Sequence, residues 1–132
     1  MTTKTEALFQ LTAPYSNPYQ GSDKKLLFVC SAGILRSATA ANLYAKKGFN
    51  TRSCGTHDYA LIPLSANLIA WADEIIFVNK ENYLVASETF KGSPVDAMLL
   101  SKAKTLNIPD NYDYNHPELI KHLEEQYESY PE

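Results

Sequence analysis

The 132-residue chain has few of the features that mark secreted or membrane proteins. It holds two cysteines, too few for the disulfide framework that stabilises small secreted domains. No apolar run approaches the ~20 residues that a membrane-spanning helix needs. The N-terminus lacks a basic start followed by an apolar core, which is the pattern of a signal peptide. We therefore expect a cytoplasmic protein without a membrane partner.

Charge of one sign is also scarce. Twelve Lys and Arg against fifteen Asp and Glu give a net charge of −3, and basic residues adjoin only at 24–25 and 46–47. The sequence therefore predicts no broad nucleic-acid-binding face. The three histidines, His57, His116 and His122, lack the spacing of a metal site, and we expect neither a metal nor another cofactor.

The remaining composition is that of an ordinary globular protein, with 45% hydrophobic and 20% charged residues. The length suits one domain. Residues 1–23 are interrupted by two prolines and a glycine, so we predict an N-terminal extension there and an α/β domain over 24–132. Whether the extension is a tail, a lid or a dimer arm stays open.

Apolar strands alternate with helical patterns along the predicted domain. We predict strands at 25–29, 49–53, 74–78 and 103–108, and helices at 37–47, 64–71, 80–90 and 117–127, with residues 95–102 ambiguous. In the last helix, Leu119, Ile120 and Leu123 form the expected buried stripe. This alternation predicts an α/β three-layer sandwich, a four-stranded parallel sheet flanked by helices on both faces.

The stretch from Leu26 to Ser37 carries the strongest functional signal. An apolar run ends in Cys30, five residues follow, and Arg36-Ser37 leads into an Ala-rich helical segment. A loop between a strand and a helix gathers backbone N–H groups and the positive helix end around one centre, which suits a tetrahedral oxyanion. The same field favours a thiolate, and an arginine fork can hold two phosphoryl oxygens. We therefore predict a phosphate-binding loop with Cys30 as its nucleophile.

The other loop residues have predicted roles as well. Substrate binding is assigned to Ser31, Ala32, Gly33, Ile34, Leu35 and Ser37. The Ser37 hydroxyl is expected to donate a hydrogen bond to the thiolate and to ease its departure. Taken singly, Cys30 also fits a buried core cysteine and Arg36 a helix-surface cation.

Val-Cys, five residues and Arg-Ser at the first strand-to-helix turn resemble the low-molecular-weight protein tyrosine phosphatase family, especially its short prokaryotic and viral-type branch. Further landmarks are Arg-Ser-Cys-Gly-Thr at 52–56, Trp-Ala-Asp at 71–73 and Ile-Pro-Asp at 108–110. The match runs from Lys24 to Tyr127. The resemblance implies a cysteine-dependent phosphatase that works through a phosphocysteine intermediate.

The leaving group of a phosphoester needs a proton from outside the loop. Asp110 matches the family's general acid and follows the predicted fourth strand, at the sheet edge where Cys30 is expected. Asp113 is the alternative acid. Walls for an aromatic leaving group are predicted from Tyr59, Tyr112 and Tyr114, for which partly exposed packing is the alternative.

Three positions depart from the family pattern. Gly33 stands where most members carry Asn; it allows a positive φ but supplies no side-chain hydrogen bond. Ala38 replaces the proline that usually follows Arg-Ser, and Asn107 stands where the short branch often has Asp.

The expected substrate is a phosphorylated protein or a small phosphorylated metabolite or nucleotide. One alternative is an enzyme resembling arsenate reductases, which relay oxidation through further cysteines; only Cys54 is available for that. Another is a non-catalytic module that binds a phosphorylated ligand. A further hypothesis makes Cys54 a disulfide partner that traps oxidised Cys30.

Overall fold

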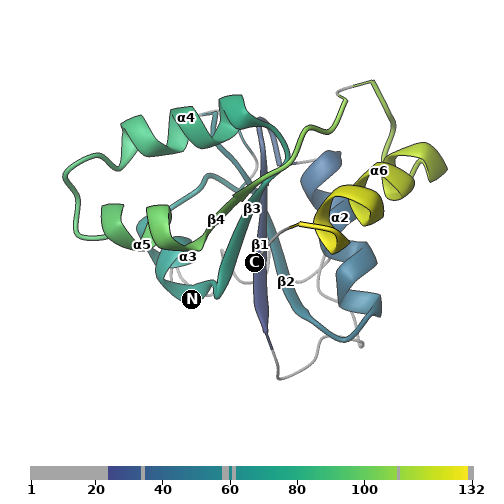
Figure 1. The fold of residues 1–132 in the computed structure, drawn as a ribbon. Coiled ribbons are helices and arrows are strands. Elements are labelled where there is room, and N and C mark those ends of the chain that lie inside the picture. The colour runs from purple at the N-terminus through teal and green to yellow at the C-terminus, as the bar shows by residue number, and fades with distance from the viewer. Residues whose placement is uncertain (1–23, 34, 58–59, 61, 110, 131–132) are drawn as a thin grey trace, which may run out of the picture.

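The structure, a computed structural model, describes residues 24–33, 35–57, 60, 62–109 and 111–130 (Figure 1). Its strands are β1 (Lys25–Cys30), β2 (Asn50–Gly55), β3 (Glu74–Phe77) and β4 (Ala103–Thr105). They form one sheet in the order β2-β1-β3-β4, and every neighbouring pair is parallel. The predicted N-terminal extension lies outside the described residues.

Helices cover both faces of the sheet, as the sequence predicts. They are α2 (Arg36–Lys46), α3 (Ala66–Trp71), α4 (Lys80–Thr89), α5 (Asp96–Lys102) and α6 (Pro117–Glu128). Figure 1 shows the sheet between two layers, with α2 and α6 on one side and the other three helices opposite. The predicted three-layer α/β architecture is therefore confirmed. Along the described residues, no helix is both long and apolar enough to cross a membrane.

Strand β1 is the centre of the core. Its residues 26–29 have no exposed surface, as expected for a parallel strand covered on both faces. Leu26 and Phe28 pack toward α2 and α6, whereas Leu27 and Val29 pack toward the other helix layer. Because side chains alternate along a strand, Cys30 belongs to the first of these two faces.

The layer of α2 and α6 packs through aromatic contacts and small residues. The ring of Tyr44 on α2 stacks on Phe28, with 5.6 Å between centroids, and meets Tyr127 of α6 edge to face at 5.0 Å. Leu119 and Leu123 of α6 are fully buried, as predicted, and each such side chain contributes roughly 1.5–3 kcal/mol. Ile120, predicted with them, is only partly buried.

Several boundaries differ from those predicted. Strand β2 continues through Cys54 and Gly55, which were expected in a loop, because both pair with the end of β1. The ambiguous segment 95–102 is largely helix α5. Strand β4 is shorter than the predicted 103–108. The N–H groups of Leu106 and Ile108 nevertheless donate hydrogen bonds to the carbonyls of Phe77 and Val78.

The buried carboxylate of Glu74, at the amino end of β3, contacts residues from several segments of the chain. Glu74 forms ion pairs with Lys24 and Lys104, and it accepts a hydrogen bond of 2.8 Å from the Tyr127 hydroxyl. Burial alone would raise the pKa of Glu74, but these three hydrogen-bonded partners outweigh burial and lower it. The ionised carboxylate therefore stabilises the folded state.

Replacing Glu74 by glutamine should lower the free energy of unfolding at pH 7 by roughly 1–3 kcal/mol, since hydrogen bonds to a charged group are lost. A lowered pKa gives stability that is present above the ordinary value of 4.5 and disappears as the pH falls through the folded-state value. Urea unfolding at several pH values should therefore show a smaller acid-dependent loss in Glu74→Gln than in wild type. Glu88→Gln, an exposed position on α4, is the control; equal pH dependence in all three proteins would contradict the assignment.

Candidate active site

Cys30 lies at the carboxyl end of β1, and α2 begins six residues later. The side chain is buried, with 3% of the residue exposed. Its Sγ atom accepts a hydrogen bond from the Gly33 N–H at 3.0 Å and lies 3.0 Å from the Ser37 Oγ. The Gly33 N–H is directed at the sulfur, and the Ser37 hydroxyl is close enough to donate a second hydrogen bond to it. The structure thus brings together Cys30, Gly33 and Ser37 as the sequence predicts.

The backbone directly after β2 holds the first half of the loop. The N–H groups of Thr56 and His57 each donate a 3.0 Å hydrogen bond, to the carbonyls of Cys30 and Ser31 respectively. The hydroxyls of Ser53, in β2, and of Thr56, directly after it, find no hydrogen-bond partner within the described part of the chain. The bracing is therefore carried by the main chain.

Gly33 lies at a point where the loop passes very close to the backbone of β2. Its φ is +75°, and a Cβ atom added there would lie 2.8 Å from the Cys54 carbonyl carbon and 3.0 Å from the Gly55 nitrogen. Real side chains do not approach backbone this closely. Any larger residue would have to push β2 away from the loop, so glycine is required by both φ and space.

The N-terminus of α2 has two features that favour binding of an anion. Of the five helices in the described residues, α2 alone has neither a side-chain cap at its N-terminus nor an acidic residue in its first turn. The first N–H groups of a helix have no partner within the helix, and the helix dipole makes that end positive. A bound phosphoryl group would satisfy both conditions.

Arg36 is the first residue of α2 and is 6% exposed. Its Nη1 donates a 3.2 Å hydrogen bond to the carbonyl of Ile108, across the sheet edge. This contact fixes the guanidinium and brings the chain that follows β4 to the Cys30 loop. Asp110, two residues further on, lies outside the described residues, as do Ile34 and Tyr59, so their predicted roles stay predictions.

The segment between Asn111 and α6 is tied to α2. The N–H of Asn115 donates to the Thr39 hydroxyl at 2.9 Å, one turn into the helix from Leu35. Tyr114 is 45% exposed, and Asp113 is also exposed. The segment therefore lies over the first turns of α2, where a rim of the site is expected.

Tyr112, predicted as a wall beside the substrate, packs against histidines at the start of α6 and within it. Its ring lies against His116 and His122, with centroids 5.0 and 5.8 Å away, and its hydroxyl is 3.4 Å from the His122 Nε2. The same ring packs on the core layer below α6. These contacts correspond to the packing alternative, and a role beside the substrate stays a prediction for Tyr114.

Cys54 is fully buried on the opposite face of the sheet from Cys30. Burial raises the pKa of the Cys54 thiol, and the charge of Cys30 raises it further, so this thiol is protonated at neutral pH. Both cysteines are free. The side chains leave the sheet on opposite sides, which argues against the hypothesis of a direct disulfide between them.

No protein-family model, no curated protein and no solved structure matches this chain. The geometry of its own residues therefore carries the functional argument.

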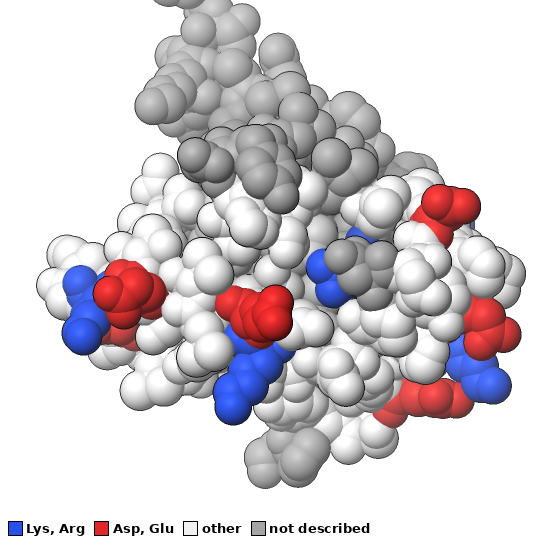
Figure 2. All heavy atoms as spheres, turned by 90° about the horizontal axis from the view of Figure 1, so that it is seen from above, with Lys and Arg blue, Asp and Glu red and all other residues white. Residues whose placement is uncertain are grey.

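Figure 2 looks down on the end of the molecule where β4 leads toward α6, which is the carboxyl edge of the parallel sheet. Acidic and basic side chains stand there in small separate groups, with uncharged surface between them. The described residues in this view form no continuous basic face. Substrate attraction would therefore rely on the loop and Arg36 rather than on a wide positive field.

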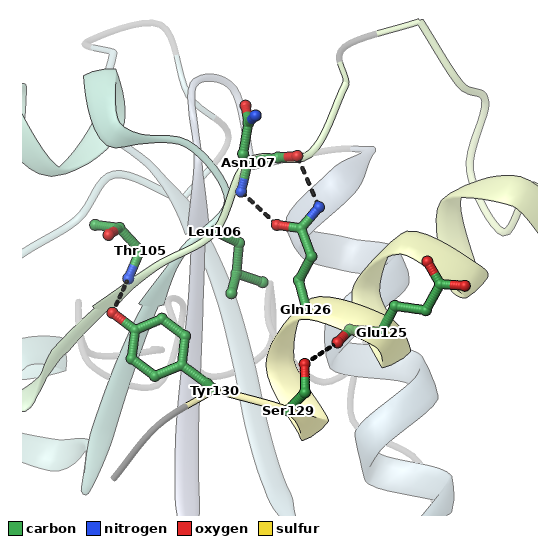
Figure 3. Close-up of a pocket in the computed structure, with 7 residues that line it drawn as sticks. All are labelled: Thr105, Leu106, Asn107, Glu125, Gln126, Ser129 and Tyr130. Atoms are coloured by element: carbon green, nitrogen blue, oxygen red, sulfur yellow. Dashed lines mark hydrogen bonds between the residues drawn. The ribbon is translucent and has the colours of Figure 1, made fainter.

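A hollow of about 510 Å³ lies away from Cys30, between the free side of β4 and α6 (Figure 3). Several polar groups that line the hollow form hydrogen bonds to one another. The Gln126 amide makes two hydrogen bonds with the backbone of Asn107, at 2.6 and 2.8 Å, and the Tyr130 hydroxyl accepts from the Thr105 N–H at 3.3 Å. No cysteine is among the described residues that line the hollow, so the Cys30 loop is the better candidate site.

One polar contact of the loop was missed at the sequence level. Asn82, in the first turn of α4, is 3% exposed, and its Nδ2 donates a 3.1 Å hydrogen bond to the Ser31 Oγ. The only available signal was an asparagine soon after a buried parallel strand, at the sheet edge shared with Cys30. Because asparagines are common at helix starts, that signal could not single out this residue.

Gly33→Ala should destabilise the protein more than the positive φ alone explains. Gly92 has almost the same φ, +76°, but a Cβ atom there would meet nothing within 4 Å. We expect Gly92→Ala to cost roughly 1–2 kcal/mol, the ordinary penalty of a left-handed residue, and Gly33→Ala to cost distinctly more. Urea unfolding of both variants measures the difference, and equal losses would show that β2 yields freely at this contact.

Proposed function

We propose that this chain is a phosphomonoester hydrolase resembling the low-molecular-weight protein tyrosine phosphatases, acting in the cytoplasm on a phosphorylated protein or a small phosphorylated metabolite. The observation that carries the proposal is the position of the Cys30 sulfur. It receives the Gly33 N–H, lies beside the Ser37 hydroxyl and sits at the foot of the uncapped helix α2. A thiolate so placed is directed at any phosphoryl group bound there.

In the first step, the Cys30 thiolate attacks phosphorus and the bond from phosphorus to the leaving-group oxygen breaks. That oxygen takes a proton from the general acid, which the family resemblance assigns to Asp110. In the second step, water attacks the phosphocysteine and gives a proton to the same carboxylate. The sulfur–phosphorus bond breaks, inorganic phosphate forms, and the Ser37 hydroxyl stabilises the returning thiolate.

Arg36 holds the charge that spreads over the phosphoryl oxygens during both steps. A planar guanidinium can contact two oxygens at once, and burial strengthens these contacts. The hydrogen bond to the Ile108 carbonyl fixes its orientation before substrate arrives, so less order has to be created in the transition state.

Burial of Cys54 opposes the alternative of an arsenate reductase. Such an enzyme passes oxidation from its first cysteine to further thiols. Cys54 is the only other cysteine in the sequence, and it lies on the far face of the sheet, protonated and without solvent contact. Hydrolysis requires no second thiol.

Cys30→Ser should abolish release of phosphate from an aryl phosphate while phosphate binding persists, because a serine hydroxyl is not ionised in this site. Cys54→Ala is the matched control and should keep its turnover. Phosphate release and binding of inorganic phosphate, followed by titration calorimetry, are the measurements. Full turnover in Cys30→Ser would refute the mechanism, whereas a wild type that binds phosphate but never turns over would identify a binding module.

Asp110→Asn should be most damaging with alkyl phosphates, which leave poorly, and least damaging with an activated aryl phosphate that needs no proton. General acid assistance is typically worth ~10²–10⁴-fold, so the contrast between the two substrates should be large. Asp113→Asn is the matched variant three residues away. If the leaving-group dependence follows Asp113→Asn instead, Asp113 is the acid.

A further inference from the structure

Asn82 makes a long-range contact that the helix carrying it does not need. Helix α4 is already capped by the Asn79 side chain, which accepts from the Glu81 N–H at 3.1 Å. Asn82 instead reaches the loop residue Ser31, 51 positions earlier in the chain. The Asn82 side chain is therefore not needed to cap the helix.

Packing does not explain the presence of Asn82 either. Asn82 is buried, and its Oδ1 atom has no hydrogen-bond partner within the described part of the chain. A buried acceptor without a donor destabilises the fold, and an apolar residue of similar size would avoid that penalty. The amide is therefore retained at a cost to stability, and its only side-chain hydrogen bond in the described structure is the one to Ser31.

The direction of this hydrogen bond fixes the Ser31 hydroxyl. A hydroxyl has one donor and two acceptor sites. Asn82 Nδ2 donates to the Ser31 Oγ, so it occupies an acceptor site and turns the hydroxyl proton away from itself. Ser31 follows Cys30 directly, and its backbone carbonyl is already held by the His57 N–H. The proton is thus available as a further donor within the loop.

We propose that Asn82 is a positioning residue that directs the Ser31 hydroxyl proton to an oxygen of the phosphoryl group bound at Cys30. This inference rests on the proposed function. The hydroxyl supplies a donor to the developing charge, in addition to the loop and Arg36, and Asn82 prevents it from turning elsewhere. Ser31 follows β1, and Asn82 belongs to the helix that follows β3. The hydrogen bond therefore also connects the loop after β1 to the segment after β3.

A double-mutant cycle tests the proposal. Ser31→Ala and Asn82→Ala should each lower kcat/KM for an aryl phosphate about tenfold, which is typical of losing one hydrogen bond to a charged group. Inhibition by inorganic phosphate should weaken by a similar factor. Because Asn82 acts through Ser31, the double variant should be no worse than Ser31→Ala alone. Asn67→Ala, an exposed asparagine on α3, is the control.

A second variant separates positioning from structure. Asn82→Leu keeps the number and branching of the side-chain heavy atoms and removes the unpartnered acceptor, so it should unfold at the same or higher urea concentration as wild type while losing as much phosphate affinity as Asn82→Ala. A merely structural asparagine would show the reverse, with stability lost and phosphate affinity kept.

The outcomes distinguish the inference from the function on which it rests. An active wild type whose kcat/KM and phosphate inhibition are unchanged by Asn82→Ala would overturn the inference alone. Losses that multiply in the double variant would also overturn it, because they would show a route that bypasses Ser31. A wild type that neither releases nor binds phosphate would overturn both.

Discussion

The close approach between Gly33 and the backbone of β2 is the constraint on which the candidate site depends. The loop can pass so near Cys54 and Gly55 because neither Gly33 nor Gly55 has a side chain and because Gly33 accepts a positive φ. In that position its N–H reaches the Cys30 sulfur at 3.0 Å. The sheet register pairs Cys30 with Gly55, and so it also fixes where the end of β1 lies relative to the end of β2. The position of the sulfur thus follows largely from backbone packing, with the Ser37 hydroxyl as its side-chain neighbour.

The fold was largely predictable because its strands are short apolar runs with helical patterns between them. Residues 26–29 and 75–77 are fully buried, and such runs identify central parallel strands without knowledge of tertiary contacts. The end of β2 was not predictable, because Cys54 and Gly55 have weak strand preference and become strand by pairing with β1. Helix α5 was ambiguous because it is short and has only one fully buried side chain, Leu99, which is too few to define an apolar helix face.

The candidate site was predictable in its local part and not in its distant contacts. Cys30, Gly33, Arg36 and Ser37 lie within eight residues, so one strand-to-helix turn relates them. The contacts of Arg36 with Ile108 and of Asn82 with Ser31 join residues 72 and 51 positions apart. Spacing along the chain holds no information about such pairs, which depend on how β3 and β4 are placed in the sheet. The same limit explains why Tyr112 was expected at the site but packs against α6.

The candidate active site and the Glu74 cluster lie at opposite ends of the strands. The Cys30 loop and Asn82 gather where the strands end, whereas the Glu74 cluster lies where β3 begins. Residues at the two ends share no described hydrogen bond or ion pair. Changes at one end should therefore combine nearly additively with changes at the other.

The clasp that Gln126 and Tyr130 form on β4 has a consequence for how molecules of this protein meet. The outward backbone groups of Thr105 and Asn107 would otherwise be an open template onto which a strand of another chain could add. The side chains of Gln126, in the last turn of α6, and of Tyr130, just after the helix, bind those groups instead. These side chains make the hydrogen bonds that a fifth strand would otherwise make with β4. Strands of other molecules therefore cannot add to this edge of the sheet as long as the end of α6 stays in place.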